Sequence, residues 1–437
     1  MTRVPIQDRM VIRRQVEVTV DGITSEGAGV GRLPDGRAVF VHRTAPGDRV
    51  EIEVVHSGAR WARGRLLTLL DEGPDRRSAP CPFFDRCGGC TLQHLRYEGQ
   101  LAAKASIVTA ALHRIGKREN LPAARLHAAP EEFHYRNRLT FTLRRLSGGR
   151  VVAGLHAMDR PERIVDVDDR CLLGEVPVLR AWKGLREGWG PGARLLPEGE
   201  ELRLTLRATA GGEVLLVVAG GHGDGDPVEL LARVPGLRAI WRLPGGDGSE
   251  PVLLAGDQGL TEEWMGEAFR LGPMAFLQVN RRAAELLHRA VVRAMGEVRE
   301  MRVLDAYCGS GGYGRWAACR GAQCIGIESD PGAARMAREG VEVGFSLLEG
   351  RVEDRIGEAL PADLALLNPP RAGVEDGVME RLAAAVTPRV IYVSCDPATL
   401  ARDVARLGSS YAIRTLEVFD LFPQTARVET LLTLTKS

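Results

Sequence analysis

One cysteine stands where a thiol could act as a nucleophile. Cys395 follows the apolar run 390–393, which predicts a buried strand, and precedes Asp396-Pro397, where a helix should begin. A thiol at the carboxyl end of a strand and near a helix N-terminus is favoured as the thiolate. A packed core thiol would show the same local pattern. Cys395 alone therefore leaves a nucleophile and a core residue both open. A carboxylate that could act with it, Glu429, lies further along the chain.

A glycine-rich loop predicts a binding site for a nucleoside-type cofactor. An apolar strand ending at Asp305 runs into Gly309, Gly311 and Gly314, and acidic Glu328 ends the next predicted strand. This spacing fits G-x-G-x-x-G. Glycines let the backbone approach a ligand closely, and an acidic residue at that position suits a ribose diol. The loop by itself is consistent with both NAD and S-adenosylmethionine.

A second loop favours S-adenosylmethionine over NAD. Asn368-Pro369-Pro370-Arg371 ends another apolar strand, so it should open on the same edge of the sheet as the glycine-rich loop. Asn-Pro-Pro after a strand resembles the fourth motif of methyltransferases that act on nucleobases or amino groups. An NAD-dependent oxidoreductase retains only the glycine-rich loop as support.

Four cysteines have a spacing that suits a metal centre. Cys81, Cys87 and Cys90 form a C-x5-C-x2-C pattern, and Cys171 lies far downstream. Four thiolates suit an iron–sulfur cluster or a tetrahedral zinc ion. In a reducing cytosol, clustered cysteines point to metal or catalysis rather than to disulfides. The remaining thiols, at Cys308, Cys319 and Cys324, are interpreted as core or turn residues.

The elements around these motifs fall into three regions. Short strands with glycine turns over residues 10–70 predict a small β-barrel. Residues 133–270 are rich in β-type runs and look antiparallel, and a helix is expected over 92–116. After Gln278, strands and helices alternate, with a helix at 281–296 and strands at 302–305, 323–328, 363–367 and 389–393. This alternation predicts a doubly wound α/β domain.

Composition indicates a globular, cytoplasmic protein. The 437 residues carry a net charge of +1, and no apolar run approaches the roughly 18 residues of a membrane span. Charges follow Met1 early, so a secretory signal is not expected. Residues 1–150 hold 25 Lys and Arg against 16 Asp and Glu. A basic N-terminal third is the electrostatic footprint expected of a nucleic-acid-binding protein, although an arginine-rich solvated surface would look alike.

Taken together, the motifs resemble the RNA uracil-C5 methyltransferases, which form 5-methyluridine in tRNA and ribosomal RNA. In chain order, the similar segments are Phe276-Leu277-Gln278-Val279-Asn280, Asp305 to Gly312, Asn368-Pro369-Pro370-Arg371, Ser394-Cys395-Asp396-Pro397 and Phe422-Pro423-Gln424 with Val428-Glu429. Residues 16–55 resemble the TRAM domain, an OB-like RNA-binding barrel. Tyr97-x-x-Gln100-Leu101-x-x-Lys104 and Tyr135-Arg136-Asn137-Arg138 also look like family signatures. The resemblance covers nearly the whole chain.

The resemblance implies a fold and a role for each motif. It implies a class I (Rossmann-like) methyltransferase domain with an N-terminal TRAM barrel and a β-rich middle domain. Cys395 would be the nucleophile and Glu429 the base. Residues that would line the S-adenosylmethionine site are Gln278, Tyr307, Gly312, Glu328 and Asn368. Those that would hold a [4Fe-4S] cluster, or less favourably zinc, are Cys81, Cys87, Cys90 and Cys171.

Three positions depart from the family pattern. The family usually has Asp where this chain has Asn368, which removes a charge while keeping a hydrogen-bonding group. A His usually stands at the position of Arg427. An arginine there should lower the pKa of Glu429, leaving it ionised at neutral pH. Gly312 replaces a residue that is often polar.

The expected protein is a methyltransferase for a uridine in large-subunit (23S) ribosomal RNA, monomeric and without a membrane partner. A tRNA substrate is the alternative within the family, and a non-catalytic RNA-binding protein with a decayed methyltransferase fold is the alternative outside it. The expected domains are the TRAM barrel at 10–70, a cluster-bearing middle domain at 71–91 and 125–270, and a methyltransferase domain at 92–124 and 271–437.

Overall fold

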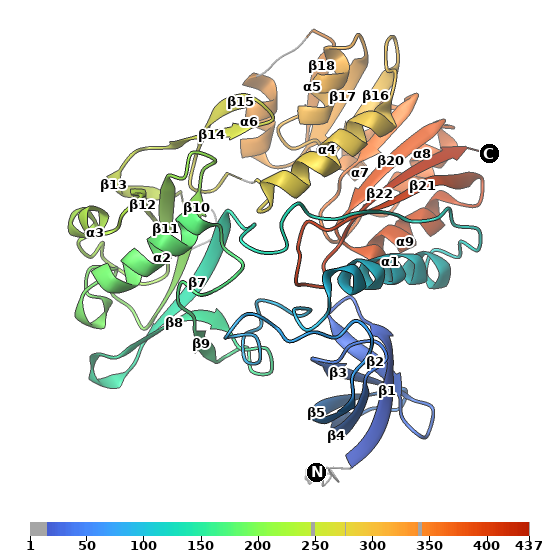
Figure 1. The fold of residues 1–437 in the computed structure, drawn as a ribbon. Helices are drawn as coiled ribbons and strands as arrows, with labels where there is room; N and C mark the ends of the chain where they lie inside the picture. The colour runs from blue at the N-terminus through green and yellow to red at the C-terminus, as the bar shows by residue number, and fades with distance from the viewer. Residues whose placement is uncertain (1–14, 246–249, 276, 340–342, 437) are drawn as a thin grey trace, which may run out of the picture. The chain divides into compact units, whose positions relative to one another are not determined.

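The computed structural model describes residues 15–245, 250–275, 277–339 and 343–436, and they form two compact units (Figure 1). Unit 1 comprises Met1–Gln100, Glu131–Arg281 and Gln424–Ala426. Unit 2 comprises Leu101–Pro130, Arg282–Pro423 and Arg427–Ser437. Among the helices of the described ranges, none is long and apolar enough to cross a membrane.

Unit 1 begins with the predicted barrel. Its strands are β1 (Gln15–Ile23), β2 (Ala28–Arg32), β3 (Ala38–His42), β4 (Arg49–Ser57) and β5 (Trp61–Asp71), closed in the order β1-β2-β3-β5-β4. Alternate side chains such as Val39, Val41 and Ala62 fill its interior. Gly29 and Gly31, expected to punctuate turns, instead lie inside β2. A Cβ on Gly31 would come within 2.4 Å of the Thr19 carbonyl oxygen, so the barrel closes only with glycine there.

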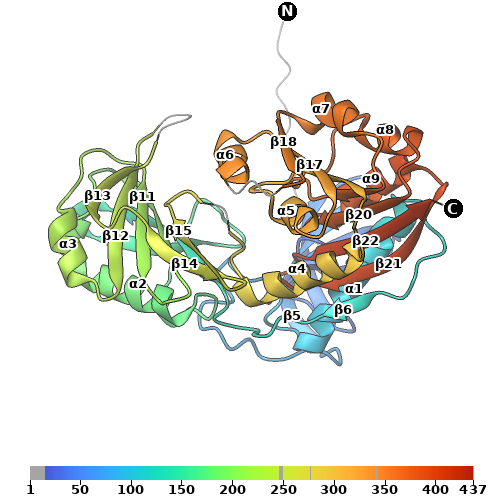
Figure 2. The same ribbon diagram turned by 90° about the horizontal axis from the view of Figure 1, so that it is seen from above.

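The rest of unit 1 is built on a seven-strand sheet with the order β13-β12-β11-β10-β7-β8-β9. Helices α2 and α3 lie beside it (Figure 2). One strand pair, β11 with β12, is parallel and is connected through α3, whereas the sequence indicated antiparallel strands throughout. The elements of this region are β7 (Arg138–Arg145), β8 (Val151–His156), β9 (Ile164–Asp166), α2 (Val176–Gly188), β10 (Glu201–Ala208), β11 (Val214–Ala219), α3 (Pro227–Arg233), β12 (Leu237–Leu243), β13 (Val252–Gly256) and the hairpin β14 (Leu260–Trp264) with β15 (Glu267–Leu271).

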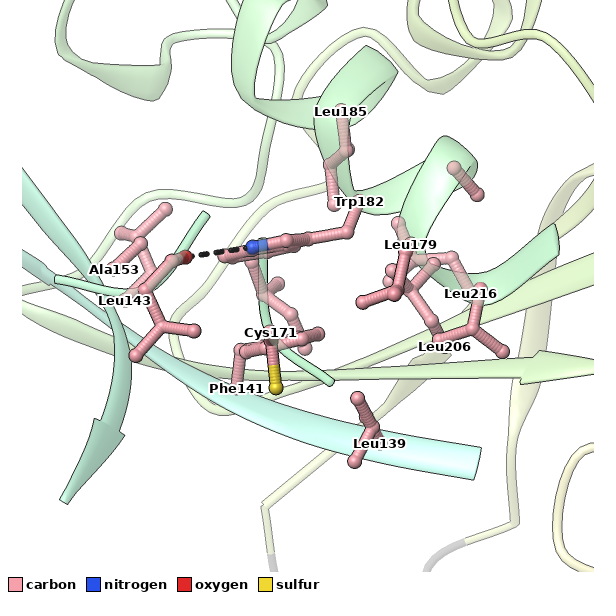
Figure 3. Packing of buried hydrophobic residues seen from close by; sticks show 14 of the residues in the cluster. Leu139, Phe141, Leu143, Ala153, Cys171, Leu179, Trp182, Leu185, Leu206 and Leu216 are labelled. Atoms are coloured by element: carbon pink, nitrogen blue, oxygen red, sulfur yellow. Dashed lines mark hydrogen bonds between the residues drawn. The ribbon is translucent and has the colours of Figure 1, made fainter. Parts of the chain in front are cut away.

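The core of this sheet is centred on one tryptophan. The Trp182 ring stacks on Phe141 at 3.8 Å between centroids, and its Nε1–H donates to the Val167 carbonyl at 2.8 Å. Cys171 lies in the same packed cluster (Figure 3). This core therefore fixes the position of Cys171, the remote member of the four predicted metal-binding cysteines.

Unit 2 is built on an eight-strand sheet with the order β18-β17-β16-β19-β20-β22-β21-β6. The strands from β18 to β20 are parallel, and β22 inserts antiparallel to β20. Its elements are α1 (Tyr97–Arg114), β6 (Arg125–His127), α4 (Arg281–Met295), β16 (Arg302–Ala306), α5 (Gly312–Ala318), β17 (Gln323–Glu328), α6 (Pro331–Glu339), β18 (Phe345–Glu349), α7 (Val352–Ala359), β19 (Leu364–Leu367), α8 (Val378–Ala384), β20 (Arg389–Ser394), α9 (Pro397–Leu407), β21 (Tyr411–Phe419) and β22 (Glu429–Lys436).

Helices cover both faces of this sheet because its strands are apolar on both sides. On one face, Leu304 and Ala365 pack with residues of α1, α7, α8 and α9. On the other, the neighbouring Val303 and Leu364 pack with residues of α4, α5 and α6. Continuous apolar strands of this kind are typical of parallel sheets. The predicted fold class, a Rossmann-like domain with a barrel and a β-rich region, is confirmed.

The helix expected over 92–116 begins only at Tyr97, because Leu95 pairs with Arg76 in a β-bridge.

Candidate active site and cysteine site

The predicted functional side chains of unit 2 follow the carboxyl ends of its parallel strands. Asp305 lies near the end of β16, Glu328 ends β17, Asn368 follows β19 and Cys395 follows β20. Strands β17 and β18 lie on one side of β16 in the sheet, and the next strand along the chain, β19, lies on the other side. The strand order therefore reverses between β16 and β19. Open α/β sheets bind their ligands at such a switch point. The sheet thus brings the glycine-rich loop, the Asn-Pro-Pro-Arg loop and the cysteine to one edge.

Two carboxylates shape the glycine-rich loop. Asp305 Oδ2 accepts the Gly314 N–H at 2.8 Å, and Glu328 Oε2 accepts the Gly309 N–H at 2.9 Å. A Cβ on Gly314 would lie 2.6 Å from the Phe345 ring, so the helix reaches the sheet only with glycine there. Burial raises the pKa of Asp305 to about 7. Side chains of the protein itself therefore fix the backbone of this loop.

The other expected cofactor residues differ in what they contact. Tyr307 has a positive φ of 61°, and its hydroxyl donates to the Glu375 carboxylate. Gly312 begins α5 and is exposed, with nothing within 4 Å of the position of a Cβ. Asn368 is exposed, and its N–H donates to the Ala306 carbonyl at 3.4 Å. Both loops thus present open surface at this edge.

Gln278 lies in unit 1, where its carbonyl accepts the Asn137 side-chain amide at 3.0 Å. Phe276, the first residue of the segment that carries Gln278, is outside the described residues.

Cys395 and Glu429 are brought together by an antiparallel strand pair. Ser394 of β20 pairs with Thr430 of β22, and the next positions along these two strands are Cys395 and Glu429. The two residues are close enough that the charge of Glu429 disfavours the thiolate of Cys395. A parallel strand at this position would have carried Glu429 to the opposite edge of the sheet.

The thiolate of Cys395 is not favoured in this ligand-free structure. Burial, followed by the charge of Glu429, raises the pKa of Cys395 above its ordinary value, and Arg371 opposes both through its charge and a hydrogen bond. The sequence predicted the opposite direction. The reason is that burial and the charge of Glu429 outweigh the effect of Arg371. In addition, Asp396 caps α9 by accepting the N–H groups of Ala398 and Thr399, both at 2.9 Å. These N–H groups at the N-terminus of α9 are therefore bonded to Asp396 and do not stabilise the thiolate.

The expected lowering of the Glu429 pKa is also wrong. Glu429 is only 6% exposed, and burial raises its pKa to about 8, while Arg371 is the cation that lowers it. Arg427 is exposed. Glu429 is therefore largely protonated at neutral pH in the free protein, because desolvation outweighs the nearby positive charge.

Arg371 is the residue that the sequence reasoning left without a role. Its guanidinium acts on both Cys395 and Glu429 and favours the charged form of each. Arg371 directly follows Asn368-Pro369-Pro370, so its position in that motif is the sequence feature that could have indicated a role in the site. Glu375, the partner of Tyr307, lies in the same connection after β19 but has no comparable sequence signal.

A buried ion pair holds the segment that leads to Glu429. Lys104 of α1 and Asp420, just after β21, are both fully buried and hydrogen-bonded to each other. Lys104 Nζ also donates to the Phe422 carbonyl at 3.2 Å, and Asp420 Oδ1 accepts the Phe422 N–H at 3.1 Å. This pair ties helix α1 to the connection between β21 and β22.

The four clustered cysteines line one small cavity in unit 1. Its walls include Cys81, Cys87, Cys90 and Cys171 together with apolar side chains such as Phe83 and Leu155. Within the described ranges, however, no group of three or more His, Cys, Asp or Glu side chains is arranged to hold a metal ion. A mononuclear zinc site would need sulfurs about 3.8 Å apart, given Zn–S bonds of about 2.3 Å in a tetrahedron. Four thiols around an apolar cavity are a donor set that suits an iron–sulfur cluster or a zinc ion.

Two arginines flank the cysteine cavity. Arg43, between β3 and β4, donates to the carbonyls of Phe84, Cys87 and Cys90, the last two at 2.9 and 3.0 Å. Arg136 is close enough to Cys90 and Cys171 for thiolates there to stabilise its charge. A set of thiolates is anionic, so these half-buried cations favour it. Burial acts in the other direction and raises the pKa of Cys90 and of Cys171 to about 12.

These features define a class of protein: an S-adenosylmethionine-dependent methyltransferase fused to an RNA-binding barrel. Residues 10–67 match the family model described as "TRAM domain", and residues 351–437 match "tRNA (Uracil-5-)-methyltransferase". The chain belongs to the TRAM-containing RNA uracil-C5 methyltransferase family, and it is an S-adenosylmethionine-dependent RNA methyltransferase.

Relatives match along the full length of the chain. It is 34% identical to an "Uncharacterized RNA methyltransferase" of Gloeobacter violaceus over 99% of both chains, and 30% identical to one of Halalkalibacterium halodurans over 96% of both. Among solved structures, it is similar to the Pyrococcus abyssi tRNA (uracil-54, C5)-methyltransferase in complex with S-adenosyl-L-homocysteine. That similarity has a TM-score of 0.73 and 26% identity, and it covers 96% of this chain and 100% of the other.

Proposed function

We propose that this protein methylates C5 of a uridine in 23S ribosomal RNA, with Cys395 as nucleophile and Glu429 as base. The observation that carries the proposal is the β20–β22 register, which puts this thiol beside this carboxylate at the ligand-binding edge of the sheet. In a non-catalytic protein with a decayed methyltransferase fold, we would not expect the buried Glu429, the thiol of Cys395 and the shared Arg371 to lie together.

The chemistry explains why these residue types are needed. C5 of uracil is a weak nucleophile, and addition of the Cys395 thiolate to C6 converts C5, C4 and O4 into an enolate, which is covalent catalysis. C5 then attacks the methyl group of S-adenosylmethionine, so that a C–C bond forms, the bond between sulfur and the methyl group breaks, and S-adenosylhomocysteine leaves. Glu429 removes the proton from C5, the C6–S bond breaks, and the thiolate of Cys395 is regenerated. Because both groups are largely neutral in the free protein, each must first release its proton to solvent, and Arg371 favours the thiolate and the carboxylate that result.

The methyl donor is assigned to the edge formed by β16, β17 and β19. Glu328 is proposed to face the ribose diol, and Tyr307, Gly312 and Asn368 to line the rest of the site on unit 2. The resemblance to the family also assigns Gln278 to the methyl-donor site. The exposure of Gly312 and Asn368 supports this assignment, since both are open to a ligand.

The cysteine cavity is assigned to a [4Fe-4S] cluster held by Cys81, Cys87, Cys90 and Cys171. The cluster would supply a covalent clamp between the 81–90 loop and the core that carries Cys171, a structural role. Support comes from the shared cavity and from the flanking Arg43 and Arg136. Anaerobic purification should give a brown protein with bound iron and sulfide, and stoichiometric zinc would overturn the assignment.

The choice of ribosomal RNA rests on the combination of a TRAM barrel with four cysteines, which the family resemblance associates with its ribosomal RNA branch. The similarity to the Pyrococcus abyssi tRNA enzyme favours tRNA as the second candidate substrate. Methylation assays on 23S ribosomal RNA and on tRNA transcripts separate the two, since 5-methyluridine should appear in the ribosomal RNA. We further propose a monomeric protein of the cytoplasm, divided into domains at 10–70, 71–91 with 125–270, and 92–124 with 271–437.

The decisive experiment traps the covalent intermediate. RNA containing 5-fluorouridine cannot lose a proton from C5, so with S-adenosylmethionine it should leave a stable adduct on the protein. Cys395→Ser should abolish the adduct, whereas Cys319→Ser, a change at an exposed cysteine of the same unit, should not. With ordinary uridine RNA, Glu429→Gln should accumulate adduct without turnover. An undiminished adduct in the Cys395 variant would remove that residue as the nucleophile.

A further inference from the structure

An aromatic and cationic patch lies on the outer surface of the barrel in unit 1. It consists of Phe40 on β3, His56 on β4, and Trp61 and Arg63 on β5, and it is called the aromatic patch below. The Trp61 ring lies 6.1 Å from Phe40 and 4.9 Å from His56 between centroids. The guanidinium carbon of Arg63 lies 5.5 Å from the Trp61 ring centroid. Trp61 is nevertheless 38% exposed, so a large aromatic surface faces outward.

The strand register explains why these four side chains gather. β5 lies between β3 and β4 in the closed barrel, with Arg63 paired to Phe40 on one side and to His56 on the other. Side chains alternate between the two faces of a strand. Val39, Val41 and Ala62 point into the core, so Phe40, Trp61 and Arg63 point outward. Three adjacent strands thus present one row of rings and a cation.

The chemistry of the aromatic patch fits unpaired nucleobases. Exposed aromatic rings offer flat faces on which bases stack regardless of sequence, and arginine adds a cation–π contribution. Phosphate attraction is a weaker explanation, because residues 15–71 carry seven arginines and no lysine against eight Asp and Glu residues. The basic excess of the N-terminal third therefore lies outside residues 15–71.

We propose that the aromatic patch is a stacking surface for unpaired bases of the RNA substrate, outside the uridine that is methylated. This inference rests on the proposed function only in taking RNA as the substrate. It assigns the barrel a contact made through base faces, whereas charged residues elsewhere in the chain supply the phosphate contacts. The patch would bind a base through the flat face of its ring and would not distinguish one base from another.

The test compares Trp61→Ala with Trp61→Phe and with the matched control Leu67→Ala. Leu67 lies on the same strand and is also 38% exposed, but it is outside the patch. Affinity of the full-length protein for a fluorescein-labelled single-stranded oligouridine is measured by anisotropy across a salt series. Trp61→Ala should weaken binding about 5- to 150-fold, the effect of losing one stacked base. Trp61→Phe should retain most of the affinity, and Leu67→Ala all of it.

The slope of log affinity against log salt should stay unchanged in Trp61→Ala, because the variant loses a stacking contact and no phosphate contact. Unaltered binding by Trp61→Ala, an equal loss in Leu67→Ala, or no binding of oligouridine by the wild-type protein would each overturn the proposal. A patch that docks a protein would give the first of these results. Adduct formation with 5-fluorouridine RNA at saturating concentration should persist in Trp61→Ala, so a failure of the catalytic assignment is seen separately.

Discussion

Ser394 of β20 and Thr430 of β22 form an antiparallel pair, and this pair sets the spacing of the candidate catalytic groups. One position beyond it, the half-buried Cys395 and the buried Glu429 lie at the edge where the parallel strands end. Burial raises the pKa of both groups, and Arg371 acts against that shift in each. The free protein therefore keeps its candidate nucleophile and base largely in their neutral forms.

The stability of the protein should depend on the ionisation of Glu429. The folded protein holds the Glu429 proton up to a pKa of about 8, whereas the unfolded chain releases it near the ordinary value of 4.5. The free energy of unfolding should thus fall by on the order of a few kcal/mol as pH rises from about 4.5 to 8. Urea unfolding at several pH values measures the slope. Glu429→Gln should flatten it, and Glu358→Gln, a change at an exposed site on α7, should leave it intact.

Arg371 should control the reactivity of both groups. Arg371→Met removes the cation that favours the Cys395 thiolate and the Glu429 carboxylate, so the 5-fluorouridine adduct should form about 10-fold or more slowly at pH 7, for a loss of roughly one pKa unit. The pH–rate profile should shift to higher pH, and Arg371→Lys should restore part of the rate. Arg338→Met, which removes an exposed ion pair on α6, serves as the control. An unchanged pH profile would assign Arg371 a purely structural role.

The Lys104–Asp420 pair should show strong energetic coupling. Lys104→Met leaves the carboxylate of Asp420 buried without its cation, which should cost about 3–5 kcal/mol, and Asp420→Leu, which leaves the ammonium of Lys104 buried without its anion, should cost a similar amount. The double variant Lys104→Met with Asp420→Leu should recover much of this loss, since no buried charge remains. A double-mutant cycle by chemical denaturation measures the coupling. Additive losses would mean that the two side chains stabilise the protein independently.

Arg43 should be needed to hold the cysteine loop. Its three hydrogen bonds to the carbonyls of Phe84, Cys87 and Cys90 fix the backbone that presents two of the thiols. In Arg43→Ala, backbone amides of residues 84–90 should exchange with solvent faster, and bound iron should be lost faster to a chelator. Arg49→Ala changes an arginine of the same barrel that makes only exposed ion pairs, so both rates should stay normal. Unchanged amide exchange in Arg43→Ala would contradict this role.

Much of the fold was predictable because its signals are local. Apolar runs marked four of the eight strands in the sheet of unit 2, namely β16, β17, β19 and β20, within one residue at each end, and the predicted helix at 281–296 is found at Arg281–Met295. The strands β6, β18, β21 and β22 were not predicted. Strand β2 was missed because its glycines were interpreted as turn residues. The parallel β11–β12 pair was missed because pairing direction depends on the α3 crossover and not on either strand's own pattern.

The sequence by itself determined which groups meet at the sheet edge, since Asp305 and Glu328 lie at or near the end of recognisable apolar strands, and Asn368 and Cys395 directly follow such strands. Only the tertiary structure decided how those groups behave. The antiparallel insertion of β22 brought Glu429 to Cys395, and burial reversed the expected direction of both pKa shifts. The barrel's closure placed Phe40, Arg63 and His56 side by side from three separate strands. Charge state and juxtaposition depend on neighbours through space, which residue order along the chain does not specify.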